Sequence, residues 1–206
     1  MIEQRSEEWF AQRCGKVTAS RIADLMAKTK TGWGASRANY KAQLVAERVT
    51  GNVAESYINN AMQWGIDTEP QAVAAYEALR LCEVAPAPFV DHPSITLAGA
   101  SPDGFVGDLG LLEIKCPNTS THIDTMLSGK IARKYLLQIQ WQLACTGREW
   151  CDFVSFDPRV GAELSLWVKR IERDNELIVE IEQAVVDFLD EIAETVSKLE
   201  QLKETK

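Results

Sequence analysis

The chain has 206 residues, of which 46% are hydrophobic and 25% charged, and its net charge is −8. These values are ordinary for a globular protein and leave room for one well-buried domain but not two comfortable ones. No apolar run reaches the length of a membrane span, and residues 1–5 lack a secretory pattern, so we expect a cytoplasmic protein without a membrane partner. The five cysteines form no CxxC pair and are odd in number, which favours reduced thiols over disulfides.

The charge is unevenly distributed along the chain. Residues 1–60 carry nine Lys or Arg against six Asp or Glu, whereas residues 161–206 carry six against twelve. A basic amino-terminal surface and an acidic tail can coexist in a protein that acts on DNA. The charge therefore neither supports nor excludes a nucleic-acid partner.

The amino-terminal part has the apolar spacing of helices, which we expect at about residues 18–28, 36–50 and 56–81. Thr18 or Ser20 is placed to cap the first helix. Residues 29–35 indicate a loop before the second helix. Gly65 and Pro70 are expected to interrupt the third helix.

Short apolar runs separated by Pro and Gly follow from residue 83 onward and are typical of strands. We expect strands at about 83–91, 95–100, 104–106, 111–115, 150–156 and 163–171. A helix is expected at about 131–146, and a long amphipathic helix from Asp174, whose apolar stripe indicates core packing, with a subunit contact as the alternative. The order of elements predicts one α/β domain over residues 1–206, with a central mixed β-sheet flanked by helices.

One short stretch combines two carboxylates with an ammonium group. Glu113 and Lys115 are two residues apart in an apolar run, so on a strand both side chains leave the same face. Residues 107–110 form a natural turn, and a hairpin around them would bring Asp103 back to Glu113. Carboxylate oxygens without His or Cys suit Mg²⁺ better than Zn²⁺. The stretch therefore predicts a metal site for phosphodiester hydrolysis.

An ordinary hairpin is the alternative interpretation, because Pro-Asp-Gly is a common turn sequence and a charge on a strand is usually solvated. The neighbours of Glu113 weigh against it, since Leu111, Leu112 and Ile114 are all apolar. A strand this apolar is expected to be buried on both faces, and a buried carboxylate needs a cation or a donor.

Further short motifs follow one another in order between about residues 9 and 175. They are residues 13–20 (RCGKVTAS), 64–69 (WGIDTE), 101–104 (SPDG), 112–117 (LEIKCP), 135–140 (YLLQIQ), 157–159 (DPR) and 171–174 (IERD). Together they resemble the lambda exonuclease family, also called YqaJ-type viral recombinases, within the PD-(D/E)xK restriction-endonuclease-like superfamily.

The resemblance implies a restriction-endonuclease-like core and a metal-dependent 5′→3′ exonuclease. Such an enzyme digests one strand of linear double-stranded DNA from a 5′-phosphate end and leaves 3′ single-stranded overhangs for phage-type recombination. The resemblance also implies a ring-shaped homotrimer and a single-strand annealing protein as partner. It further implies two Mg²⁺ ions per active site, with Mn²⁺ as a substitute.

The family pattern also assigns roles to the residues of the predicted metal site. The metal ligands are Asp103, Glu113 and the main-chain carbonyl of Ile114. Lys115 would orient or deprotonate the attacking water. Glu69 would be a further metal or water ligand, and Gln138 would bond the water or Lys115. On residue type alone, Glu69 would be a first-turn helix acid and Gln138 a solvent-facing amide.

Residues for binding the DNA end come from the same resemblance. Arg13, Ser20 and Ser101 are candidates for a 5′-phosphate pocket, since Arg clamps phosphate and hydroxyls add donors. On residue type alone, Arg13 would be a surface charge and Ser20 a helix cap. Met62 is a candidate wedge against the terminal base pair, or else a packed helix residue. Lys30 is a candidate contact to the duplex backbone.

The chain departs from the family after the E-x-K-C-P segment. Relatives tend to place an Arg there, where this chain has residues 119–122 (TSTH). We expect either a less positive pocket or substitution by His122 or Arg133. His92 and His122 are otherwise interpreted as non-catalytic, because neither has a metal-ligand partner nearby in sequence.

Two other functions compete with the exonuclease. A structure-specific or restriction-type endonuclease would use the same active site. A non-enzymatic DNA-binding subunit would have lost Asp103, Glu113 or Lys115, and all three are present.

Overall fold

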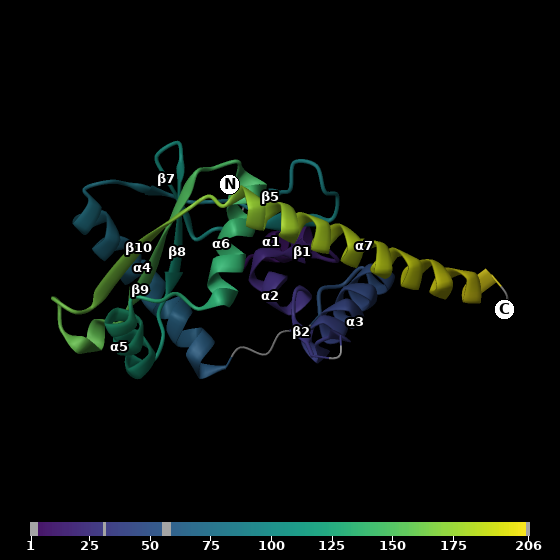
Figure 1. The fold of residues 1–206 in the computed structure, drawn as a ribbon, viewed down its shortest axis with the longest axis horizontal. Coiled ribbons are helices and arrows are strands. Elements are labelled where there is room, and N and C mark those ends of the chain that lie inside the picture. Colours follow the sequence, from purple (N-terminus) through teal and green to yellow (C-terminus); the bar gives the residue numbers. More distant parts are fainter. Residues whose placement is uncertain (1–3, 31, 55–58, 205–206) are drawn as a thin grey trace.

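The computed structural model describes residues 4–30, 32–54 and 59–204 (Figure 1). The helices are α1 (Glu7–Arg13), α2 (Ile22–Leu25), α3 (Ala35–Thr50), α4 (Asn60–Arg80), α5 (Thr119–Ser128), α6 (Arg133–Thr146) and α7 (Asn175–Glu204), and the 3₁₀ turns are η1 (Ala19–Arg21) and η2 (Pro158–Val160). The strands are β1 (Val17–Thr18), β2 (Lys28–Thr29), β3 (Gly32–Trp33), β4 (Val84–Ala85), β5 (Val90–Asp91), β6 (Ala98–Ala100), β7 (Gly104–Val106), β8 (Gly110–Lys115), β9 (Trp150–Phe156) and β10 (Leu166–Glu172). Within these ranges, no helix is long and apolar enough to cross a membrane.

The largest sheet has the strand order β10-β9-β8-β7-β4. Strands β8 and β9 are parallel, and the other neighbours are antiparallel. Helix α6 lies on one face of this sheet and α4 on the other (Figure 1). The sequence prediction of an α/β fold with a central mixed sheet flanked by helices is therefore confirmed.

Strand β8 is buried on both faces because its side chains alternate between two apolar clusters. Leu111 packs in the cluster that contains α6 and α7. Leu112 and Ile114 pack in the second cluster, against Ala72 and Tyr76 of α4. The face that carries Leu111 also carries Glu113, which is 0% exposed. The expected burial of this strand is thus confirmed, and it places a carboxylate beneath α6.

The predicted hairpin forms between β7 and β8. Gly104 pairs with Leu112 and Phe105 pairs with Leu111, which places Asp103 beside the Glu113 end of the strand. A side chain at Gly104 would overlap Val84 of the neighbouring strand β4. The glycine of the Pro-Asp-Gly segment therefore serves close strand packing as well as the entry into β7.

A small sheet of order β1-β6-β5 joins the amino-terminal segment to the Ser101 region. Val17 pairs with Ala98 and Thr18 with Gly99, in parallel. The end of α1 is thereby held near the residues that follow β6. This pairing brings together two motifs that are about 90 residues apart in sequence.

The long helix α4 differs from the prediction, because it runs without a break through Gly65 and Pro70. Proline removes one helical hydrogen bond, but Thr68, Ala72 and Tyr76 bury the adjoining face against the sheet, and tertiary packing decides the outcome. Residues 56–58, where we expected this helix to begin, lie outside the described residues.

Other elements are shorter than expected or were not predicted. The expected helix over 18–28 is divided into η1, α2 and strand β2, because residues 28–29 pair with residues 32–33 as a hairpin. The expected strand over 83–91 is limited to β4 and β5, since Pro86 and Pro88 lack ladder donors. Helices α1 and α5 were not predicted, although Ser6 and Asn118 cap them with side-chain oxygens.

Helix α7 begins where the sequence indicated and packs its stripe into the core, as predicted. Ile181, Val185, Phe188 and Ile192 are each 0% exposed. The far end of α7 extends beyond the body of the molecule (Figure 1).

Candidate active site

The hairpin brings the two predicted metal-binding carboxylates together. The main-chain N–H of Asp103 donates to the Leu112 carbonyl at 3.1 Å. The Oδ2 atom of Asp103 accepts from the Ile114 N–H at 2.6 Å. These bonds fix Asp103 against the end of β8, with Glu113 and Lys115 on the adjoining strand residues.

Glu113 accepts hydrogen bonds from three side chains. Its Oε1 accepts from Lys115 Nζ and, at 2.7 Å, from Gln138 Nε2. Its Oε2 accepts from Gln142 Nε2 at 2.6 Å. Both glutamines belong to α6, which covers this face of the sheet. A fully buried carboxylate is unfavourable unless it accepts hydrogen bonds. The three donors therefore offset the free energy of removing the Glu113 carboxylate from water.

Lys115 lies at the border between the interior and solvent, with its side chain 28% exposed. Burial lowers the pKa of Lys115, but the carboxylates of Glu113 and Asp103 outweigh that effect and raise it above its ordinary value. The Nζ atom also lies 5.2 Å from the ring centroid of Tyr135. Lys115 is therefore a cation in this arrangement.

The pKa of Asp103 is raised well above its usual value, first by burial and then by the negative charge of Glu113. Lys115 opposes this shift. Two carboxylates that repel one another in a partly dry site favour a divalent cation between them, and their hard oxygens suit Mg²⁺ or Mn²⁺. Across the described residues, no group of three or more His, Cys, Asp or Glu side chains could hold a metal ion. A cation there would need main-chain, water or phosphate oxygens as well.

Glu69 lies on α4 and forms an ion pair with Arg5, in which Oε2 and Nη2 are 2.7 Å apart. Its charge raises the pKa of Asp103 and of Cys116, so it lies near the carboxylate pair. Burial, together with the negative charges of Glu69 and Asp103, raises the pKa of the Cys116 thiol to about 12, which makes this cysteine a poor nucleophile. Glu69 belongs to α4, which covers the face of the sheet opposite to α6.

The candidate phosphate residues are brought together only in part. Arg13 Nη1 donates to Ser101 Oγ at 3.1 Å, and the Trp9 indole donates to the same oxygen at 3.0 Å. The guanidinium of Arg13 also stacks on the Trp9 ring, 4.0 Å from its centroid. Burial lowers the pKa of Arg13 to about 10, while Tyr40 and Glu47 oppose the shift, so the group remains charged at neutral pH. Arg13 is thus a partly buried cation held by Trp9 and Ser101, and its phosphate-binding role stays a prediction.

Ser20 lies in η1 and is exposed, as are the two other candidate DNA contacts. Met62 is 48% exposed in the first turn of α4, which contradicts the alternative of a packed helix residue. Lys30 lies in the turn between β2 and β3. Their predicted roles stay predictions.

His122 cannot replace the missing arginine of the phosphate pocket. It is 0% exposed on α5, and its two ring nitrogens bond Ser155 Oγ at 2.7 Å and the Leu164 carbonyl at 2.8 Å. The proposed substitution by His122 is therefore wrong, because the ring is used to pack α5 against β9. His92 is also buried and bonds Glu182, as expected for a non-catalytic histidine.

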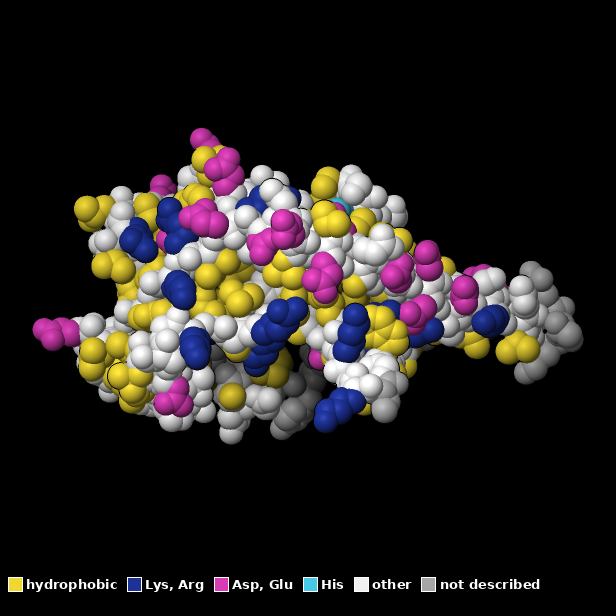
Figure 2. Space-filling model, in the orientation of Figure 1, with side chains coloured by type: hydrophobic (Ala, Val, Ile, Leu, Met, Phe, Trp, Pro, Cys, Tyr) yellow, Lys and Arg dark blue, Asp and Glu magenta, His cyan; other side chains and the backbone are white. Residues whose placement is uncertain are grey.

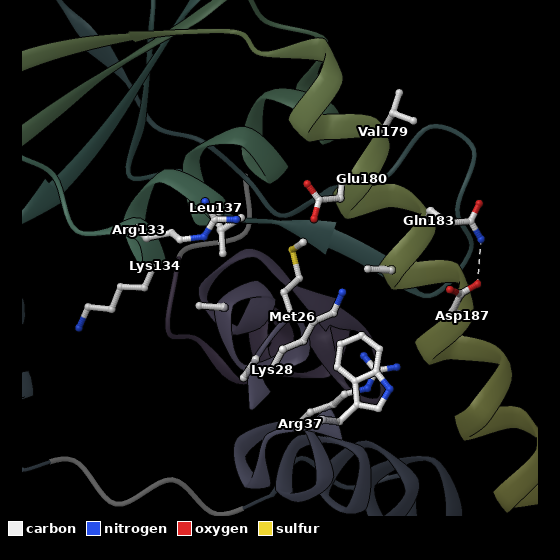
Figure 3. A pocket seen from close by; sticks show the side chains of 14 residues that line it. Met26, Lys28, Arg37, Arg133, Lys134, Leu137, Val179, Glu180, Gln183 and Asp187 are labelled. Carbon is white, nitrogen blue, oxygen red and sulfur yellow. Dashed lines mark hydrogen bonds between the residues drawn. The ribbon is translucent and has the colours of Figure 1, made fainter. Parts of the chain in front are cut away.

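Arg133 lines a pocket of about 860 Å³ between α2, α3, α6 and α7 (Figure 3). Arg133 and Lys134 lie on the α6 side of the pocket, whereas Glu180 and Asp187 lie on α7. On the face shown in Figure 2, Lys and Arg side chains gather across the middle of the molecule, and Asp and Glu side chains predominate along α7. The pocket lies close to the candidate site, since Lys134, which lines it, and Lys115 both contact the ring of Tyr135.

Three neighbours of the site were not predicted from the sequence. They are Arg5, Trp9 and Gln142. The hydrogen-bond partners of Arg5 and Trp9 lie more than 60 residues away in the sequence, so no local pattern indicates these two contacts. The signal for Gln142 was its position four residues after Gln138, on the same face of a helix.

Known proteins resemble this chain closely in sequence and structure. The model of the YqaJ-like viral recombinase domain matches residues 8–149. The alkaline exonuclease of Laribacter hongkongensis is 50% identical, over 97% of this chain and 99% of its own, with a TM-score of 0.91. Its structure in complex with dAMP matches with a TM-score of 0.92 at the same identity and coverage. No curated protein sequence matches the chain significantly.

A more distant structure extends the likeness of the fold. A phage-related exonuclease from Haemophilus somnus 129PT is 16% identical over 89% of this chain and 96% of its own, with a TM-score of 0.69. At this identity the likeness concerns the fold alone.

Proposed function

The chain belongs to the YqaJ-like viral recombinase family. We propose that it is a metal-dependent 5′→3′ exonuclease acting on linear double-stranded DNA. The product would be a duplex with 3′ single-stranded overhangs for phage-type recombination. The observation that carries this proposal is the buried Glu113 carboxylate beside Asp103 and Lys115, in a chain 50% identical to an alkaline exonuclease over nearly its full length.

The donor set supports a role for Mg²⁺ or Mn²⁺. Asp103, Glu113 and the main-chain carbonyl of Ile114 would hold the cation, and two ions per site agree with the family pattern. A bound divalent cation polarises the scissile phosphate and stabilises the leaving oxygen.

The chain's own groups would then prepare the attacking water. Lys115 carries a positive charge at the mouth of the site, where it can orient a water by hydrogen bonding. Gln138 holds Glu113 in place and presents its amide beside Lys115. Glu69, on the opposite side, would orient a second water or a cation once DNA displaces Arg5.

Binding of the DNA end would use the cluster of Arg13 and Ser101. Arg13 is held by the Trp9 ring, so its guanidinium is preorganised for a 5′-phosphate. Ser20 would complete the pocket from η1. Met62 would act as a wedge at the terminal base pair, and Lys30 would contact the duplex backbone.

The assembly and location follow from the family rather than from the contacts described above. We propose a homotrimeric ring around the DNA and a single-strand annealing protein as the functional partner. The five free cysteines agree with a cytoplasmic location.

A time course on linear duplex DNA tests the proposal. With Mg²⁺, a 5′ label should be released early as a mononucleotide, a 3′ label late, and a closed circular duplex should stay intact. EDTA should stop the reaction. Release from the 3′ end first would contradict the polarity, and cutting of the circle would identify an endonuclease instead.

A further inference from the structure

Gln142 holds the second oxygen of the Glu113 carboxylate. It lies one helical turn after Gln138 on α6, so the two amides leave the same helix face. Gln138 bonds Oε1 at 2.7 Å, and Gln142 bonds Oε2 at 2.6 Å. Gln142 and Glu113 are each 0% exposed. The carboxylate is therefore gripped at both oxygens by one rigid element.

This grip determines which acceptor site of Glu113 remains open. An ionised carboxylate has about four lone-pair sites. Two sites on Oε1 are taken by Lys115 and Gln138, and one on Oε2 is taken by Gln142. The remaining site lies on the oxygen that Gln142 holds, so this amide sets the direction in which the free lone pair points.

The other end of the Gln142 amide shows that this orientation is imposed. Its Oε1 is buried and, within the described part of the chain, has no hydrogen-bond partner. An unpaired buried oxygen is unfavourable, and an apolar side chain would pack there without that penalty. Turning the amide over would aim Oε1 at the Glu113 carboxylate, acceptor against acceptor. The single use of the amide is therefore to donate to Glu113.

We infer that Gln142 is a positioning residue that fixes the Glu113 carboxylate for a divalent cation. This inference rests on the proposed function. Without Gln142, the Glu113 carboxylate would be held at Oε1 alone and could rotate about its terminal bond. Its open lone pair would then no longer point in one fixed direction. The expected consequence is weaker metal binding, because groups that orient a ligand contribute about 10- to 100-fold to metal affinity.

The test is Mn²⁺ binding to the full chain without DNA, measured by titration calorimetry. Met has nearly the length of Gln but no amide, so Gln142→Met removes the donor and preserves the packing. We expect at least a 10-fold loss of Mn²⁺ affinity. The Mn²⁺ concentration for half-maximal nuclease rate should rise by a similar factor, and high Mn²⁺ should restore part of the rate.

Gln140 provides a matched control on the same helix. It is also buried, but its amide bonds the Glu172 carbonyl and the Asp174 N–H, both at 2.9 Å, away from the site. Gln140→Met should lower thermal stability and leave Mn²⁺ affinity unchanged. If Gln142→Met does not fold, Gln142→Asn serves instead, because its shorter side chain keeps an amide that cannot reach Glu113.

Wild-type Mn²⁺ affinity in a folded Gln142 variant would overturn the inference and leave the proposed function in place. An equal loss of affinity in Gln140→Met would also overturn it, since the effect would then be general to the helix. A wild-type chain that binds no Mn²⁺ and leaves DNA uncut would instead overturn the proposed function, and the inference with it.

Discussion

The two parts of the candidate site are built in opposite ways. The Glu113 carboxylate is buried in the interior, where donors from β8 and α6 hold Oε1 and a donor from α6 holds Oε2. Three of the candidate DNA contacts, Ser20, Met62 and Lys30, are instead exposed at the surface. Reacting groups gain from a rigid, poorly solvated setting, because electrostatic interactions are stronger there. Groups that meet a long polyanion must remain open to it.

The largest effect should come from the buried part. Lys115→Ala removes the ammonium group that lies beside Glu113 and should lower the cleavage rate by about 10²- to 10⁴-fold. Binding of linear duplex DNA, measured by fluorescence anisotropy with Ca²⁺, should change little. Turnover at the wild-type rate would remove Lys115 from the catalytic set.

A smaller effect is expected at the DNA end. A 5′-hydroxyl duplex should be digested about 10- to 100-fold more slowly than a 5′-phosphate duplex. A factor of this size corresponds to the free energy of one charge-assisted hydrogen bond. Arg13→Ala should abolish most of this difference by slowing only the phosphorylated substrate. His122→Ala is the control, because it should lower the melting temperature and keep the preference. Equal rates on both ends in the wild type would contradict a phosphate pocket at Arg13 and Ser101.

The half-buried carboxyl group of Asp103 should also make stability depend on pH. The folded-state pKa of Asp103 is raised, so the folded chain keeps a proton that the unfolded chain loses near pH 4. This contribution to stability is complete below the unfolded pKa and is lost as the pH rises through the folded pKa. In EDTA, the melting temperature of Asp103→Asn should therefore decline less between pH 4 and 8 than that of the wild type. Parallel curves would show that Asp103 titrates normally.

The smallest effect should come from the exposed Met62. Met62→Ala should slow digestion of blunt ends a few-fold and leave ends with a single-stranded 5′ flap unaffected, because only a paired end needs a wedge. Its exposure predicts a change in unfolding free energy of at most about 0.5 kcal/mol. A rate unchanged on blunt ends would exclude the wedge.

Local patterns predicted the buried half of the site better than the exposed half. The alternation in β8 and the turn at residues 107–110 were sufficient to place Asp103 beside Glu113, since both depend on strand geometry. The position of Gln138 came from the family resemblance. Gln142 was missed because helical spacing shows which residues share a face but not what that face meets.

The errors have a common physical origin in long-range packing. Pro70 was expected to interrupt a helix, but burial of one face of α4 outweighed the missing hydrogen bond. His122 was considered for a surface pocket, yet α5, which the sequence did not indicate, carries it into the interior. Neither outcome can be derived from neighbours in sequence.

The parallel pairing of β8 with β9 has a consequence for the order in which the protein matures. Parallel strands need a long crossover, here through α5 and α6, and contacts between distant segments form slowly because loop closure is costly. Glu113 and its two glutamines meet only when that crossover has closed. A nascent or half-folded chain would therefore lack the completed carboxylate site, so we expect nuclease activity to appear only after this crossover has folded.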